Sequence, residues 1–287
     1  MKIWLLFAIA SIFASWLHNF TLKIAAEKKY NISVINILSN FISLLIFWLI
    51  LVFQAKNIYY SNIWIIIFLA LLNWLFFFFS MFSRIESLKN IDTVLFFPLY
   101  KTFWPIFVTL MSIFFFKETL ETKELIWIII WILIPLLLIN NTEKIRQKNL
   151  FYWIFLVILT AIFVTISTWA SKEIMIKKYD MYLYLFISSF IATIFWVISY
   201  YIFTYKKNWF NLGKKELKFS IISWIFYFLS FYLFMVALNW NMAIVYTINS
   251  FSILIPIILS IIFYKEHFDF KKWFVIFLSI VSMMFFI

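Results

Sequence analysis

A lysine stands near the middle of residues 91–118, an otherwise mostly apolar stretch about long enough to cross a bilayer. This residue is Lys101, and Pro98 and Pro105 flank it. A charge at such depth costs about 2.5–3.5 kcal/mol on insertion scales, and no acidic residue lies within the core of any predicted span to pair with it. Each proline removes a backbone donor and tends to bend or break a helix. The pattern predicts a membrane site for a carboxylate or a phosphate, with a lysine that only reaches toward water as the alternative.

Aromatic and polar residues on two predicted spans complete this candidate substrate-binding site. Tyr100 and Trp104 flank the lysine and could stack on a ring or a cation. In span nine, Tyr246, Asn249 and Ser252 recur about one turn apart. Ordinary packing is the alternative for the two flanking aromatic residues, and a helix–helix hydrogen bond is the alternative for the asparagine.

Two further groups carry chemistry outside this stretch. His18 and Asn19 lie about a turn before the end of the first span. A histidine there could couple transport to protons, with packing or hydrogen bonding as the alternative. Glu118 and Glu266 fall at the ends of spans four and nine, where we expect ion pairs or capping of the next helix rather than binding.

Composition predicts an all-α membrane protein that crosses the bilayer many times. The 287 residues are 66% hydrophobic, with a mean hydropathy of +1.03. The net charge of +12 is first a topology signal in such a protein, so no nucleic-acid partner is expected. The chain has no cysteine and two histidines far apart, which predicts no metal site and no cofactor. Its single glycine excludes the glycine-based catalytic and nucleotide motifs, so an enzyme is not expected.

Runs of about 20 apolar residues predict ten transmembrane helices joined by short segments. The predicted spans are 3–22, 33–53, 62–83, 92–116, 124–140, 150–171, 181–204, 218–238, 242–264 and 272–287. These spans make a multi-pass protein, which we expect in the cell inner (plasma) membrane.

The two halves of the chain resemble each other at an offset of 149 residues. Lys23 matches Lys172, and the Lys-Lys-Tyr sequence at residues 28–30 recurs at residues 177–179. A Lys-Glu pair recurs near an offset of 148. Chance is an unlikely source of these matches in register, so the sequence predicts an internal duplication.

The duplication predicts two inverted five-helix repeats, residues 1–146 and 147–287. Because five is odd, the second repeat enters the membrane from the opposite side. Such repeats place a substrate site near the midplane between them and allow alternating access. We expect the first span to be retained rather than cleaved as a signal peptide, because it has a counterpart in the second half.

The sequence resembles the drug/metabolite transporter superfamily, and within it the EamA-like ten-helix transporters. The residues that carry the resemblance are Lys23 and Lys172, Ser87-Leu88 and Ala237-Leu238, Pro105 and Pro256, and Glu118 and Glu266. The family usually has glycine before the closing glutamate, where this chain has Lys117 and Lys265. It often has a basic residue early in span two, where this chain has Asn40.

The resemblance implies a secondary carrier with a central pocket lined by both halves. We expect a small anionic or zwitterionic metabolite as substrate, amino-acid-like or nucleotide-like, moved by an exporter or exchanger in contact with the lipid bilayer. A channel or a non-transporting scaffold is the alternative. Coupling to protons or to exchange stays open, as does oligomeric state. The orientation is open too: basic residues in the loops favour termini outside the cytoplasm, whereas members of the family usually have termini inside.

Overall fold

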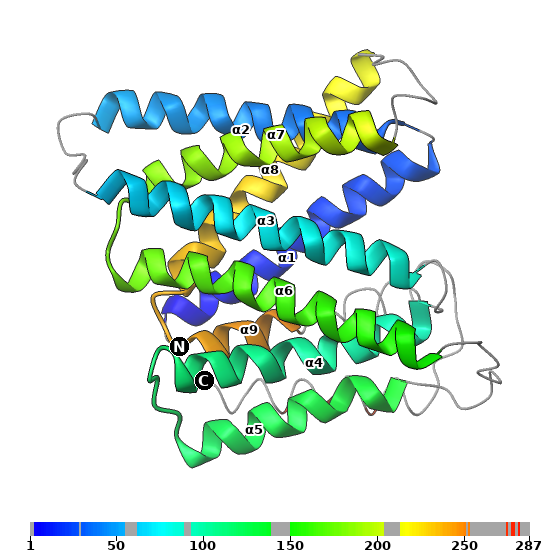
Figure 1. Cartoon of the computed structure of the whole chain (residues 1–287), viewed down its shortest axis with the longest axis vertical. Helices are drawn as coiled ribbons and strands as arrows, with labels where there is room; N and C mark the ends of the chain where they lie inside the picture. Colours follow the sequence, from blue (N-terminus) through cyan, green and yellow to red (C-terminus); the bar gives the residue numbers. More distant parts are fainter. Residues whose placement is uncertain are drawn as a thin grey trace. The chain divides into compact units, whose positions relative to one another are not determined.

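All the regular structure that the described residues form is helical. The computed structural model describes residues 3–28, 30–54, 62–88, 93–138, 150–203 and 213–250, together with 252, 274, 277, 278 and 281. Within these ranges there is no strand. The helices (Figure 1) are α1 (Ile3–Glu27), α2 (Ile32–Gln54), α3 (Ile63–Leu88), α4 (Thr93–Phe114), α5 (Thr122–Leu133), the 3₁₀ helix η3 (Ile134–Leu138), α6 (Leu150–Ile176), α7 (Met181–Phe203), α8 (Lys214–Ala237) and α9 (Met242–Ser250).

Seven of these helices are long and apolar enough to cross a membrane: α1, α2, α3, α4, α6, α7 and α8. Each of the seven begins and ends within five residues of a predicted span. The fifth predicted span is α5 followed by η3. The structure describes the first part of the ninth span as α9, and the tenth lies almost entirely outside the described residues. The prediction of an all-α, multi-pass membrane protein is confirmed to this extent.

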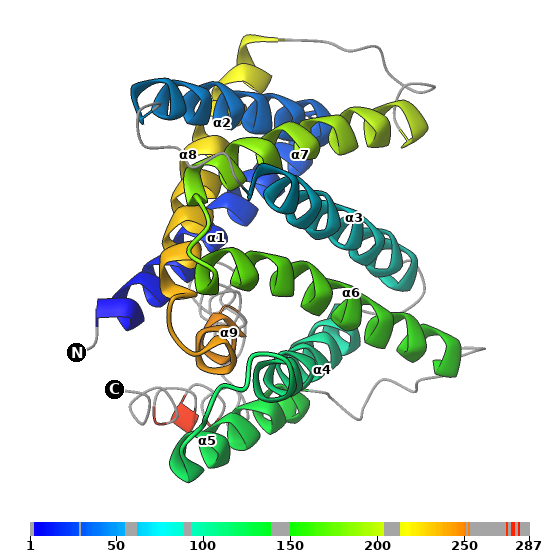
Figure 2. The ribbon, with the colours of Figure 1, turned by 60° about the vertical axis from the view of Figure 1, so that its left-hand side comes forward.

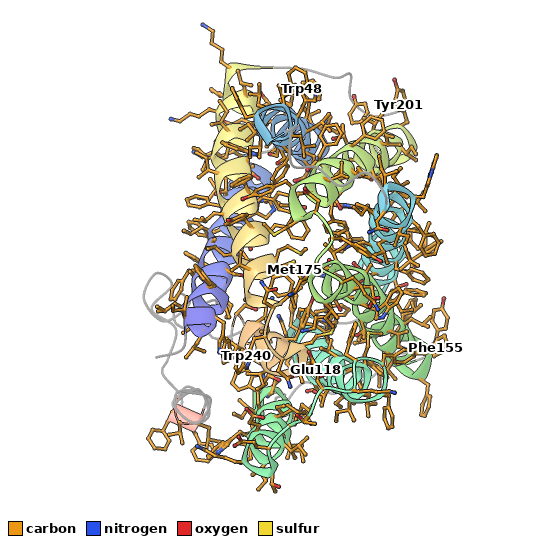
Figure 3. All side chains as sticks on the ribbon, turned by 90° about the vertical axis from the view of Figure 1, so that its left-hand side faces the viewer. Trp48, Glu118, Phe155, Met175, Tyr201 and Trp240 are labelled. Carbon is orange, nitrogen blue, oxygen red and sulfur yellow. The ribbon has the colours of Figure 1, made fainter. Side chains whose placement is uncertain are left out.

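Small side chains occupy helix contacts in this nearly glycine-free chain. The alanines that are 3% exposed or less are Ala8, Ala14, Ala25, Ala70, Ala161, Ala170, Ala192, Ala237 and Ala243. Such residues let helix backbones approach closely in a membrane. Several buried hydroxyl groups donate to a carbonyl one turn earlier, as Ser39 does to Ile35 at 2.8 Å, which satisfies these donors within their own helix. By contrast, Trp48, Phe155 and Tyr201, labelled in Figure 3, are more than half exposed and suit contact with lipid tails.

The described helices form two compact units, and each mixes segments from both halves of the sequence. One unit, called the α2/α7 unit below, consists of Ala10–Leu75 and Ala170–Val236. The other, called the α4/α9 unit, consists of Met1–Ile9, Phe76–Trp169 and Ala237–Ile287. The units therefore do not coincide with the two predicted repeats.

In the α2/α7 unit, α2 packs along α7 (Figures 1 and 2). Val34 and Ile37 of α2 form a buried cluster with Tyr200 of α7. The predicted repeats make α2 and α7 equivalent helices. This unit therefore pairs one helix of each half with its own counterpart.

The turns that lead into α2 and α7 have the same hydrogen bonds. The side-chain oxygen of Asn31 accepts the backbone N–H of Val34 at 3.3 Å, and that of Asp180 accepts the N–H of Leu183 at 2.8 Å. Both are N-terminal caps, in which a side chain satisfies a backbone donor that the first helical turn leaves free. The two pairs are 149 residues apart, the offset of the sequence repeat.

The ends of α1 and α6 match in the same way. Tyr30 donates its backbone N–H to the carbonyl of Ala25 at 2.9 Å, and Tyr179 donates to Ile174 at 3.0 Å. The second of these turns contains Lys178 with a φ of 53°, in the left-handed region. Glycine is the residue that adopts this region without strain.

In the α4/α9 unit, α4 packs against α9, α5 and η3 (Figure 2). The helix continues through both Pro98 and Pro105, so neither proline breaks it. Thr102 ties α4 to its neighbour by donating to the carbonyl of Ile132 at 3.2 Å. Beyond the end of α4, Lys117 has a φ of 52°. This is the left-handed region, which glycine adopts without strain.

Candidate functional site

Helix α4 places Lys101 against the chain that follows α9. The ammonium Nζ donates a hydrogen bond to Ser252 Oγ at 2.9 Å. Lys101 is the ninth of the 22 residues of α4, and Ser252 lies two residues beyond the described end of α9. The α4/α9 unit therefore joins the candidate cation of span four to a candidate hydroxyl of span nine.

A ladder of aromatic rings runs along α4 beside the lysine. Phe96, Tyr100 and Trp104 are four residues apart and stack with ring centroids 5.9 and 5.6 Å apart, each pair 14° from parallel. Tyr246 of α9 meets the Trp104 ring edge-on at 5.3 Å. All four residues are 7% exposed or less. The spacing of four puts the three rings of α4 on one helix face. We call these three rings, together with that of Tyr246, the ring ladder.

The lysine ammonium lies near two of these rings. Nζ is 5.0 Å from the Trp104 ring centroid and 6.0 Å from that of Tyr100. The ring faces carry negative charge density and attract a cation at these distances. The indole Nε1 of Trp104 is buried and has no hydrogen-bond partner. A donor of this kind is costly in a dry interior, so a bound acceptor would stabilise it.

Asn249 lies on α9, half-buried and one turn from both Tyr246 and Ser252. No hydrogen bond between described residues joins it to Lys101. Of the predicted binding residues, five come together in this unit: Lys101, Tyr100, Trp104, Tyr246 and Ser252. Their role in binding remains a prediction.

Glu118 fixes where α9 begins relative to the end of α4. Its Oε2 accepts the backbone N–H of Met242, the first residue of α9, at 2.8 Å. The same oxygen accepts the hydroxyl of Ser112 on α4. Figure 3 labels Glu118 and Trp240, which precedes α9. The carboxylate thus caps a helix distant in sequence, in agreement with the expected structural role.

His18 belongs to the α2/α7 unit, where it packs against α8. Its Nδ1 lies 3.0 Å from Ser223 Oγ and 3.2 Å from the Ser223 carbonyl oxygen. Its ring lies 5.3 Å from that of Tyr227. These contacts fit the packed and hydrogen-bonded interpretation of this histidine. Asn19 lies in α1, and its side chain falls outside the described part of the chain.

The same unit contains a buried polar cluster that joins three helices. Asn73 Nδ2 of α3 donates to Ser171 Oγ of α6 at 2.7 Å and to Tyr184 Oη of α7 at 2.6 Å. Ser171 and Tyr184 are themselves 3.0 Å apart. Lys172, next in α6, is 2% exposed. Hydrogen bonds between all three members make this cluster a structural tie between the helices.

Two buried or half-buried cations were missed as site candidates because the predicted spans ended too early. Arg84 and Lys172 each lie one residue beyond a predicted span, and the structure extends α3 to Leu88 and α6 to Ile176. Each of these predicted spans ends at the last residue before the charge, although the helix continues past it. Within the described ranges, no group of histidine and acidic side chains could hold a metal ion.

Comparisons with known proteins agree with this fold. Residues 151–287 match the model of the EamA-like transporter family. A crystal structure of another protein is similar over 99% of this chain and 98% of its own, with a TM-score of 0.72 at 12% sequence identity. It is one of 28 matching chains of solved structures. At this identity the likeness shows the fold alone. A comparison with curated proteins gives no match.

Proposed function

We propose, from the premise that this chain belongs to the drug/metabolite transporter superfamily, that it is a secondary active transporter of a small anionic or zwitterionic metabolite. The substrate would be amino-acid-like or nucleotide-like, moved by alternating access in an exporter or exchanger of the cell inner membrane. The members of the family are membrane transporters, which favours a transporter over an enzyme. The observation that carries the finer proposal is the ammonium of Lys101, held by Ser252 and two aromatic rings.

The energetics of this lysine favour an anionic partner. A cation at this depth costs about 2.5–3.5 kcal/mol to insert. The hydrogen bond to Ser252 and the contact with the Trp104 ring offset part of that. No carboxylate among the described residues forms an ion pair with it. A substrate carboxylate or phosphate would neutralise the charge and could also accept the free Nε1–H of Trp104.

A proline next to the lysine suits the ammonium group of a zwitterion. Pro105 has no N–H, so the carbonyl of Lys101 lacks its usual donor four residues later. Lys101 thus has a backbone acceptor freed from the helix. Such an acceptor suits a cationic group next to the anion that the lysine would bind.

Two inverted repeats, residues 1–146 and 147–287, are part of the same proposal. The matched turns before α2 and α7 support them, because both their caps and their preceding bonds recur at an offset of 149. The pairing of α2 with α7 and of α4 with α9 supports them as well. Elements next to a two-fold axis pack against their own counterparts, and these are the helices that the repeats make equivalent.

Counterflow in proteoliposomes tests the proposal. A panel of amino acids, nucleotides and carboxylic acids is first screened for thermal stabilisation of the purified protein, and the compounds that stabilise it are then used as labelled substrates. We expect saturable exchange with the wild-type protein. Linear flux that does not saturate would indicate a channel, and no flux with any stabilising compound would indicate a scaffold.

Lys101→Met tests the site. We expect it to abolish ligand stabilisation and exchange. Because it removes a buried charge, we expect the melting temperature without ligand to stay the same or rise. Lys215→Met, which removes an exposed lysine of α8, is the control and should change neither. Exchange by Lys101→Met at wild-type kinetics would refute the assignment of this lysine.

A further inference from the structure

A second cation lies close to Lys101 in the α4/α9 unit. Arg84 of α3 places its guanidinium carbon 5.3 Å from the centroid of the Phe97 ring. Phe97 is four residues before Lys101 on the same face of α4, about 6 Å along the helix axis. Both cations therefore contact or belong to the same turn of α4, and we treat them together.

No carboxylate balances either charge within the described residues. Arg84 has the Phe97 ring as its contact, and Lys101 has Ser252 and two rings. Two like charges repel more strongly in a membrane interior than in water, because the surrounding dielectric constant is lower. An anion bound between the two cations would relieve this repulsion.

Each cation has an unpartnered polar group one turn further along its own helix. Ser87 follows Arg84 by three residues, is fully buried, and its Oγ has no hydrogen-bond partner. Trp104 follows Lys101 by three residues, is 7% exposed, and its Nε1 has none either. A spacing of three places each pair on one helix face. The unit therefore contains two pairs, Arg84 with Ser87 and Lys101 with Trp104, each made of one cation and one polar group without a hydrogen-bond partner.

We infer that the site binds a dianion, with one negative group at Lys101 and Trp104 and the other at Arg84 and Ser87. This inference rests on the proposed function and narrows its substrate to dicarboxylates and phosphomonoesters. Arginine suits the second position because its planar guanidinium holds a carboxylate or phosphate through two parallel hydrogen bonds. Arg84 is then the residue that selects a doubly charged substrate over a singly charged one.

Succinate and succinamate are matched probes for this selection, because they have the same length and differ by one negative charge. Binding is measured by calorimetry on the full chain in nanodiscs of phosphatidylcholine, which contain no net anionic lipid. We expect wild-type protein to bind succinate about tenfold or more tightly than succinamate, the factor that one charge-assisted hydrogen bond supplies. Arg84→Gln should remove this preference, and Arg84→Lys should restore part of it.

Each other outcome is decisive. An unchanged preference in Arg84→Gln overturns the inference, as does a wild-type protein that fails to prefer succinate or that binds neither succinate nor inorganic phosphate. A lipid headgroup presents the same phosphate chemistry, and Arg84 is one turn from the end of α3. Nanodiscs with added phosphatidic acid distinguish this source: if Arg84→Gln changes only stabilisation by that lipid, the inference is wrong.

Lys101→Met separates this inference from the function on which it rests. If Lys101→Met loses binding of both probes and Arg84→Gln still prefers succinate over succinamate, only the role of Arg84 is refuted. Unchanged binding of both probes in Lys101→Met refutes the proposed site itself.

Discussion

Replacing Glu118 tests whether one carboxylate holds the start of α9 against the end of α4. Its Oε2 accepts the N–H of Met242 at 2.8 Å and the hydroxyl of Ser112. Met242 opens α9, so the negative charge lies at the positive end of that helix dipole. Helix α9 carries Tyr246 of the ring ladder, and Ser252 follows it. A loss of this cap should therefore affect both stability and the geometry around Lys101.

The expected magnitude follows from the contacts that are lost. In Glu118→Ala, loss of the cap costs about 0.5–2 kcal/mol and loss of the charge at the dipole about 0.3–1 kcal/mol. The fully buried Ser112 also loses its acceptor, at about 1–3 kcal/mol, less if its hydroxyl turns to the carbonyl one turn earlier. We expect a total of about 2–5 kcal/mol. Glu118→Gln keeps an acceptor oxygen and should lose only about 0.5–1.5 kcal/mol.

Thermal unfolding of the purified protein, measured beside counterflow, provides the assay. Glu124 is the matched control, because its carboxylate also accepts a helix-start N–H, that of Glu121 at 2.9 Å, but in an exposed and local setting. Glu124→Ala should cost at most about 1 kcal/mol. If Glu118→Ala destabilises no more than Glu124→Ala, the long-range cap is not structural. If Glu118→Gln abolishes exchange without lowering the unfolding temperature, the carboxylate has a functional role instead.

Two other predictions concern the backbone and the helix pairs. Lys178→Gly should stabilise the protein by about 0.5–1 kcal/mol in thermal unfolding, because glycine adopts the φ of 53° without strain. Lys177→Gly is the control, because it removes the same charge at an adjacent exposed position without a left-handed backbone. It should destabilise the protein by a similar amount. Changes of the unfolding temperature with the same sign in both variants would contradict this argument. Cysteines at Ile37 and Tyr200, in a chain that has no native cysteine, should allow a short thiol crosslinker to join α2 to α7 with exchange retained; loss of exchange on crosslinking would mean that these helices must separate.

The sequence was sufficient to predict helix positions. Long apolar runs can be satisfied in a membrane only by helices, which is why the seven spanning helices fall close to their predicted bounds. Lys101 was identifiable as a candidate because a lone charge in such a run needs a specific reason. Its hydrogen bond to Ser252 was not predicted, because two spans can each be identified without showing that they touch.

Contacts set by tertiary structure could not be read from the residues. Arg84 lies one residue beyond the predicted third span, and only the tertiary structure brings it over Phe97. The cap from Glu118 to Met242 joins residues 124 apart in sequence, and no local pattern encodes that pairing. His18 had two open interpretations because its partner, Ser223, is 205 residues away in the sequence.

The mixing of the two halves within each unit limits how an alternating-access motion can occur. If residues 1–146 moved as one body against residues 147–287, α2 would have to leave α7 and α4 would have to leave α9. The first separation would expose the buried cluster around Val34 and Tyr200, and the second would break the hydrogen bonds from Lys101 to Ser252 and from Glu118 to Met242. A motion that keeps both helix pairs intact breaks none of these contacts. If the proposed alternating access is correct, we therefore expect each moving body to keep α2 with α7 or α4 with α9, and the boundary between the predicted repeats not to be the boundary of motion.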